Sequence, residues 1–201
     1  MERPDWIADF ADKDIKDRLA PFAEGDKETL MRVDEAIANF NERNLSESAS
    51  LKAQENFMSW NHKGWEGLGS FDSKERQLAN DLLGFKAGII FPTVAFDQVM
   101  AAKDEAIVLG GVRALNRGMA SFCEEDSRMF GVAYIPFQYG KEIALEYLKD
   151  AIKLGFSVIA IDTIAPKGAK ASTHPDFDCV WQEIQEADIA ITLHVGIDNS
   201  W

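Results

Sequence analysis

The chain has 201 residues, 46% of them hydrophobic, and is long enough to form one domain with its own core. Its formal net charge of −13 argues against a nucleic-acid partner, because phosphate binding needs clustered Lys and Arg. No stretch approaches the roughly 18 apolar residues of a membrane span, and Met1–Trp6 lacks the apolar segment of a secretion signal. Cys123 and Cys179 lie far apart without CxxC spacing, which predicts buried thiols of a cytoplasmic protein and no disulfide.

Residues 1–83 are polar, with short stretches of helical periodicity between irregular ones. We expect a mainly helical or irregular segment here, as the first part of a single domain spanning residues 1–201. The predicted elements are a helix at Asp12–Leu19 stopped by Pro21, a helix at Lys27–Phe40, a loop at Asn44–Ser50, and a helix capped by Ser73 that ends at Gly84.

Residues 84–201 alternate between short apolar runs and segments with helical spacing. The apolar runs predict strands at Phe85–Phe91, Gly131–Ile135, Phe156–Ile161 and Ile189–Val195. The segments between them predict helices at Phe96–Ser121, Lys141–Leu154 and Pro175–Ala187.

The fold class follows from the character of these strands. Each is a continuous apolar run, which is typical of parallel strands that are buried on both faces. Neither GxGxxG nor GxxxxGK[ST] follows a strand, so a dinucleotide or P-loop sheet is disfavoured. We therefore expect an α/β fold: an incomplete TIM-type (β/α)8 barrel with about four of its eight parallel strands.

In such a barrel, chemistry gathers at the carboxyl ends of the strands. His194 there is either a core histidine bonded to a backbone carbonyl, or a metal ligand or general base; its position before Gly196 favours the second interpretation. Asp162 either bonds a neighbouring loop or touches substrate, and Phe137 either lines a substrate pocket or packs in the core. His174, which precedes a proline at a helix start, is expected to cap that helix or face solvent.

Several segments, in order, resemble the amidohydrolase superfamily, and within it the amidohydrolase-related group that includes aminocarboxymuconate-semialdehyde decarboxylase. The matching segments are Pro4–Ile7, Arg76–Thr93, Arg128–Pro136, Ala144–Gly155, Ser172–Phe177 and Leu193–Gly196.

This resemblance implies a barrel enzyme with a divalent ion, commonly zinc, in which His194 matches the metal-binding histidine of a middle strand. The implied activity is a metal-dependent hydrolase acting on a small carboxylated or cyclic substrate through an activated water. A carboxy-lyase (decarboxylase) of the same family is the alternative, and a catalytically dead truncated copy is another, because the other matching ligand positions are missing. The open strand edges of a partial barrel also predict a homo-oligomer or aggregation.

Overall fold

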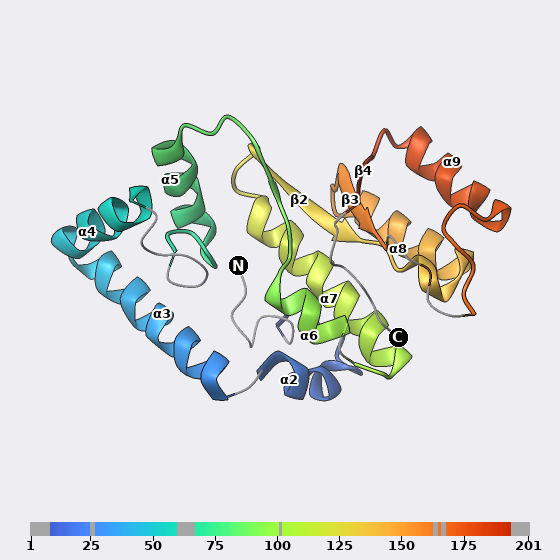
Figure 1. The fold of residues 1–201 in the computed structure, drawn as a ribbon, viewed down its shortest axis with the longest axis horizontal. Helices are drawn as coiled ribbons and strands as arrows, with labels where there is room; N and C mark the ends of the chain where they lie inside the picture. The colour runs from blue at the N-terminus through green and yellow to red at the C-terminus, as the bar shows by residue number, and fades with distance from the viewer. Residues whose placement is uncertain are drawn as a thin grey trace.

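The computed structural model describes residues 9–24, 27–59, 67–100, 102–162, 165 and 168–193 (Figure 1). His194 lies outside these residues. The predicted role of His194 therefore stays a prediction.

Four strands form one parallel sheet in the order β1-β2-β3-β4. The strands are β1 (Gly88–Ile90), β2 (Met129–Tyr134), β3 (Val158–Ile161) and β4 (Ala190–Leu193). In the register, Ile89 lies opposite Phe130, Val132 opposite Val158, and Val158 opposite Ala190. The prediction of an α/β fold with four parallel strands is confirmed.

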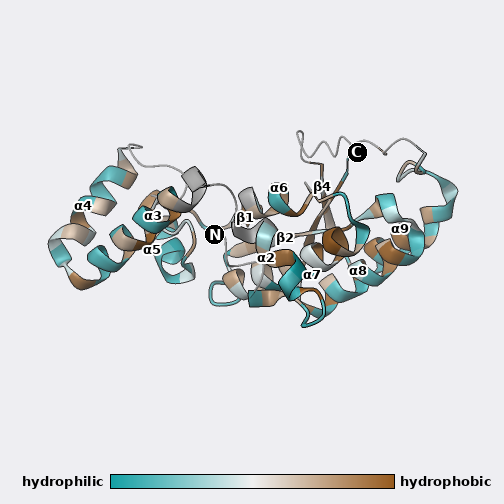
Figure 2. Cartoon of the chain, turned by 90° about the horizontal axis from the view of Figure 1, so that it is seen from below, coloured by the Kyte–Doolittle hydropathy of each residue, from teal (hydrophilic) through white to brown (hydrophobic). Residues whose placement is uncertain are grey.

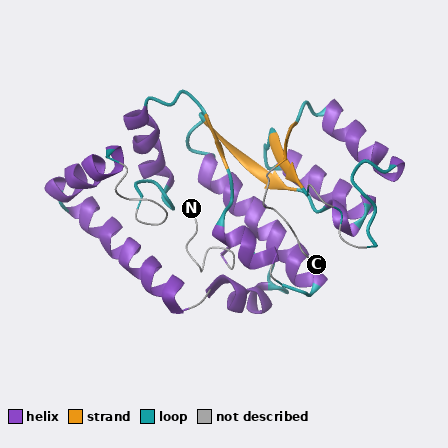
Figure 3. Cartoon of the chain, in the orientation of Figure 1, coloured by secondary structure: helices purple, strands orange, loops and turns teal. Residues whose placement is uncertain are grey.

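Helices connect the strands (Figure 3). They are α6 (Val94–Met100), α7 (Glu105–Cys123), α8 (Lys141–Lys153) and α9 (Asp178–Glu186). The last three pack on one face of the sheet, whereas Phe96 of α6 meets Tyr134, whose side chain lies on the other face. Gly131 of β2 shows how closely they pack, because a Cβ added there would meet Met119 and Cys123 of α7 at 2.8 and 3.2 Å. The main hydrophobic core lies between these helices and this face of the sheet.

The opposite face of the sheet carries a small cluster of its own, formed by Val132, Val158 and Ala160. Burial on both faces holds for β3 and for all of β2 except Phe130, but it is wrong for the outer strands. Ile89 of β1 is 52% exposed and Leu193 of β4 is 65% exposed, and among the described residues each of these strands has a neighbouring strand on one side only. Figure 2 shows the brown, apolar colour of the strands.

Before the sheet, the chain folds into α2 (Lys16–Glu24), α3 (Lys27–Leu45), α4 (Glu47–Met58) and α5 (Ser73–Leu83). The predicted loop at residues 44–50 is wrong: only Ser46 separates two helices, and its hydroxyl caps α4 by accepting from the Ala49 backbone at 3.3 Å. Pro21 lies inside α2 and does not end it. Leu19 of the same helix is fully buried, so tertiary packing outweighs the hydrogen bond that proline removes.

Three further helix boundaries differ from the prediction in ways that local chemistry explains. Asp72, not Ser73, caps α5 by accepting from the Glu75 backbone at 2.9 Å, whereas the left-handed Gly84 at the other end confirms the predicted stop. The single helix expected at residues 96–121 is two helices, because Asp104 caps a new start at α7. The helix expected from Pro175 begins as a 3-10 turn, η3 (Pro175–Phe177), before α9.

A buried ion pair joins the N-terminal helices. Arg43 of α3 donates to both carboxylate oxygens of Glu75 of α5, at 2.5 and 2.7 Å, and both residues are under 10% exposed. Glu75 also accepts from the backbone of Gly69 at 3.2 Å. Two helices and the loop before α5 therefore converge on one carboxylate.

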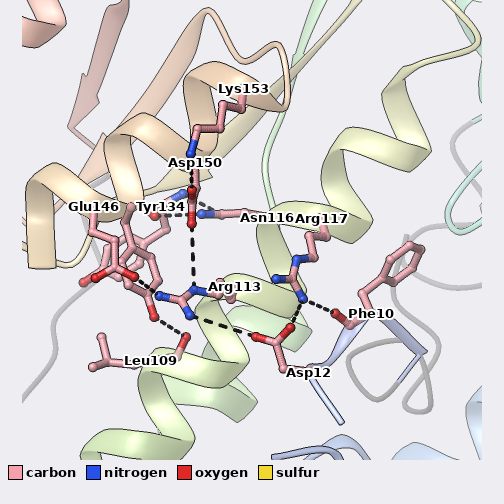
Figure 4. A network of polar contacts seen from close by, with 11 residues as sticks. Phe10, Asp12, Leu109, Arg113, Asn116, Arg117, Tyr134, Glu146, Asp150 and Lys153 are labelled. Atoms are coloured by element: carbon pink, nitrogen blue, oxygen red, sulfur yellow. Dashed lines mark hydrogen bonds and ion pairs between the residues drawn. The ribbon is translucent and has the colours of Figure 1, made fainter.

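A second polar network, centred on Arg113, joins α7 to α8 and to the chain before α2 (Figure 4). Arg113 pairs with Glu146 and lies over the ring of Tyr147, 4.8 Å from its centroid. The Tyr147 hydroxyl returns to α7 by donating to the carbonyl of Leu109 at 2.8 Å. Burial raises the pKa of that hydroxyl, so it stays protonated and able to donate.

None of the helices in the described ranges combines the length and the apolar character that crossing a bilayer requires.

Candidate functional site at the carboxyl ends of the strands

Polar side chains meet where β2 and β3 end. Tyr134 is the last residue of β2, and Asp162 follows the last residue of β3. Because neighbouring parallel strands end at the same edge of a sheet, these two side chains come together there. The Tyr134 hydroxyl donates to Oδ2 of Asp162 at 2.6 Å, and both residues are buried.

This contact answers part of the question that the sequence left open for Asp162. The carboxylate bonds a neighbouring element, as the structural interpretation holds, although that element is strand β2 and not a loop. At 2.6 Å the bond is short, as expected for a hydroxyl that donates to a carboxylate. A role for Asp162 in substrate binding stays a prediction.

Tyr134 is held from two further sides. The ring of Phe96, from α6, meets the Tyr134 ring edge-on with centroids 4.9 Å apart. Asn116, from α7, bonds both backbone groups of Tyr134 at 3.0 Å. The hydroxyl therefore approaches Asp162 from a ring and a backbone that are both fixed.

The amide of Gln138 adds an open hydrogen-bonding position to this group. Its Oε1 lies 3.2 Å from the Tyr134 hydroxyl, and its Nε2 is buried without a hydrogen-bond partner among the described residues. A single hydroxyl proton serves Asp162 at 2.6 Å, so exchanging the two ends of the amide would let its NH2 donate to the tyrosine oxygen. In either orientation, one end of the Gln138 amide remains available to another polar group.

The surroundings of this edge are acidic. Tyr139 lies in η2 (Phe137–Tyr139), and its pKa rises to about 12 through burial, with the charges of Glu105, Asp162 and Asp104 adding to the shift. The phenol is therefore neutral at physiological pH. A metal cation at this edge would meet favourable fields from these carboxylates.

Phe137 faces the helices and the core. Its exposed fraction is 3%, and its ring lies 5.0 Å from that of Phe177 and 5.4 Å from that of Trp181, measured between centroids. These contacts match the packing interpretation of this aromatic residue. Its assignment to a substrate pocket stays a prediction.

The predictions for His174 and for the two cysteines have different outcomes. His174 caps η3 by accepting from the backbone of Asp176 at 3.2 Å, which confirms the expected capping role. Cys123 and Cys179 are both free, but Cys123 is half-buried and Cys179 is exposed, so the expectation of two buried thiols is met only in part by Cys123 and is wrong for Cys179. Cys179 lies in the first turn of α9, outside the buried pair of that helix, Val180 and Ile184.

The metal prediction has no ligand set in the described part of the chain. No three His, Cys, Asp or Glu side chains among those residues are grouped so that they could hold an ion. A catalytic zinc site takes three protein ligands. Asp162 alone does not meet this requirement, and His194 lies outside the described residues.

A hollow of about 240 Å³ lies at the opposite, amino ends of β2 and β3. Cys123, Met129, Gly131 and Phe156 are among the residues that line it. Burial raises the pKa of the Cys123 thiol to about 11, so this wall of the hollow is uncharged at neutral pH. In parallel α/β folds this end of the strands contributes to stability and not to chemistry.

The sequence alone did not identify Tyr134, Asn116 or Gln138 as part of this site. For Tyr134 a signal was present, because the two-residue period of a strand places it on the same face as Val132 and at the chemical end of β2. Asn116 looks like any polar residue of an amphipathic helix. Its role depends on where β1 ends, which the sequence does not specify.

No family model matches this chain, and no match is found among curated proteins or among solved structures.

Proposed function

We propose that this chain carries part of the active site of a metal-dependent hydrolase of the amidohydrolase-related family, acting on a small carboxylated or cyclic substrate. The observation that carries the proposal is the buried Tyr134–Asp162 pair at the carboxyl ends of neighbouring parallel strands. That is the edge at which parallel α/β enzymes place their chemistry. A decarboxylase of the same family would use the same edge and the same kind of metal centre.

The described residues would orient the substrate. Asp162 is a fixed acceptor whose position is set by the Tyr134 hydroxyl, and Tyr134 is itself fixed by Asn116. The Gln138 amide beside them has one buried end without a hydrogen-bond partner among the described residues, which a polar group entering the site could bond. Prearranged polar groups of this kind stabilise charge without reorganising during the reaction.

A divalent ion, when bound in such an enzyme, lowers the pKa of a coordinated water to about 7. The described residues do not supply three ligands for it. His194 can therefore serve as a ligand only together with groups outside the described residues. The roles assigned to Tyr134, Asp162 and Gln138 are independent of the metal.

The metal content of the purified chain tests this proposal. After incubation with zinc and exhaustive dialysis, we expect one equivalent of metal in the wild-type chain and in His174→Ala, and none in His194→Ala. His174 is the matched control because it caps an exposed turn. Metal lost equally from both variants, or absent from the wild type, would contradict a metal enzyme and favour the catalytically inactive copy.

A substrate screen then separates the two reactions. Product analysis on small cyclic amides and small carboxylic acids distinguishes added water from released carbon dioxide. We expect Asp162→Asn to weaken substrate binding, while Asp150→Asn, an exposed carboxylate on α8, leaves it unchanged. Equal effects of the two substitutions would argue against a substrate role for Asp162.

A further inference from the structure

Both edges of the sheet expose apolar side chains, and no strand within the described part of the chain pairs with their outer backbone. On β1, Ile89 is 52% exposed, and on β4, Ile191 and Leu193 are 41% and 65% exposed. Beside Ile89 on the same face of the sheet, Phe130 is 40% exposed. Strand edges of this kind are templates for pairing with another chain.

The number and direction of the strands determine how pairing with another chain can close the sheet into a barrel. Four parallel strands are half of the eight that enclose a barrel interior just filled by side chains. Because all four strands run in the same direction, a two-fold axis along the strands places β4 of one copy beside β1 of the other, again in parallel. Each place where β4 of one copy pairs with β1 of the other is a seam. Two identical seams leave no open strand edge, as a closed two-fold assembly requires.

The side-chain faces restrict the register at each seam. Ile89 shares a face with Phe130, Phe130 with Val132, Val132 with Val158, and Val158 with Ala190. Ile89 must therefore lie opposite Ala190 or opposite Thr192 of the other copy, since any odd shift would turn one strand inside out.

Charges at the seam agree with both registers. With Ile89 opposite Ala190, Ala87 lies opposite Asp188; with Ile89 opposite Thr192, Phe85 does so. In each case Lys86 lies one residue from the position that faces Asp188. Both residues precede their strands, and Asp188 has φ +53°, so the alternation of the strands does not place their side chains on opposite faces. Both of these charged residues are exposed, and among the described residues neither has an ion-pair partner within its own chain.

We propose that a second copy of this chain closes the sheet, so that β1 and β4 of each copy pair with β4 and β1 of the other and two half-barrels form one eight-stranded barrel. The seam joins Lys86 of each copy to Asp188 of the other, and the exposed faces of Ile89 and Phe130 become the interior. This assembly does not depend on metal binding or catalysis.

Sedimentation velocity of the full chain over a range of concentrations tests the dimer. We expect a species of twice the 22.4 kDa chain mass. Lys86→Glu should raise the dimer dissociation constant about tenfold or more, and adding Asp188→Lys to it should restore dimerisation. Lys52→Glu, on the exposed surface of α4, is the control and should change nothing. A monomer at every concentration, an open series of larger oligomers, or a dimer indifferent to both charge reversals would overturn the proposal.

Disulfide trapping provides a second test that does not depend on those charges. In a Cys123→Ser/Cys179→Ser background, Ile89→Cys combined with Ala190→Cys or with Thr192→Cys should yield a covalent dimer on mild oxidation. Within one chain the two edges are three strand spacings apart, about 14 Å, which is beyond the roughly 7 Å Cα separation that a disulfide bridges. The single-cysteine variants should stay uncrosslinked. Absence of a cross-link in both double variants, with circular dichroism showing a folded chain, would exclude the seam.

Discussion

The side chain of Asn116 takes the place of a strand beside Tyr134. Its Nδ2 donates to the Tyr134 carbonyl and its Oδ1 accepts from the Tyr134 amide, both at 3.0 Å. On the other side of β2, the Ile135 amide bonds the carbonyl of Ala160, so the backbone groups of Tyr134 point toward β1. Because β1 ends at Ile90, opposite Gly131, strand pairing does not reach Tyr134. An amide side chain satisfies what would otherwise be two buried, unpaired backbone groups.

We therefore expect Asn116→Ala to lower the free energy of unfolding by about 2–4 kcal/mol, because it removes two buried hydrogen bonds to the backbone of Tyr134. Asn44→Ala is the matched control, since its amide makes one exposed bond to the Phe40 carbonyl at 2.9 Å. It should cost less than about 1 kcal/mol. Urea denaturation followed by circular dichroism measures both. Equal losses would mean that the bonds of Asn116 do not stabilise the end of β2.

The Arg43–Glu75 pair predicts that the free energy of unfolding depends strongly on both residues. Arg43→Met should destabilise the chain by about 3–5 kcal/mol, because a buried carboxylate loses its cation. Adding Glu75→Leu should recover much of that loss, since the orphaned charge is then removed. The exposed pair Arg18–Asp104 is the comparison, and Arg18→Met should cost about 1 kcal/mol or less. If Arg43→Met and Arg18→Met have equal effects in chemical denaturation, the buried pair does not hold α3 to α5.

Two glycines with nearly the same backbone conformation should respond differently to alanine. Gly69 has φ +71° and Gly84 has φ +68°. A Cβ at position 69 would lie 2.4 Å from the Arg76 Cα, while position 84 has open space. We expect Gly84→Ala to cost about 1–2 kcal/mol, the strain of the left-handed conformation alone. Gly69→Ala should cost at least about 2 kcal/mol more, because a backbone clash is added. Equal midpoints in urea would show that the loop before α5 can move aside.

The half-buried thiol of Cys123 should lower the free energy of unfolding at alkaline pH. Burial raises its pKa in the folded state from the ordinary 9.0 to about 11, against a smaller opposing effect of the Arg76 charge. Between those two pH values the unfolded chain has released a proton that the folded chain retains, so rising pH favours unfolding. Cys123→Ser should remove this part of the pH dependence, because serine does not ionise in that range.

The exposed Cys179 provides the control for this measurement. Urea midpoints between pH 7 and pH 10.5 should fall less steeply in Cys123→Ser than in wild type, while Cys179→Ser should follow wild type. Alkylation at pH 8 should likewise reach Cys179 before Cys123. A Cys123 that reacts as fast as Cys179 would show that its environment is open to water.

The sequence by itself determined the class of the fold. Continuous apolar runs such as 131–135 and 156–161 are compatible with buried parallel strands and little else, and the amphipathic run at 141–154 allows only a helix. It also located the end of β3 at Ile161, because the polar Asp162 follows the apolar run there, whereas the predicted ends of β1 and β2 each lay one residue too far.

Tertiary structure decided which side chains meet at the strand ends and where the elements depart from the sequence-based prediction. Ser46 separates two helices where polar composition predicts a loop, because one hydroxyl suffices to cap the second helix. Asp162 meets Tyr134 through strand order, and Asn116 meets Tyr134 because β1 is short. Exposure of β1 and β4 likewise follows from their position at the edges, since their composition is as apolar as that of the central strands. Local periodicity encodes which face of an element is apolar, whereas its neighbour in space depends on where every other element ends.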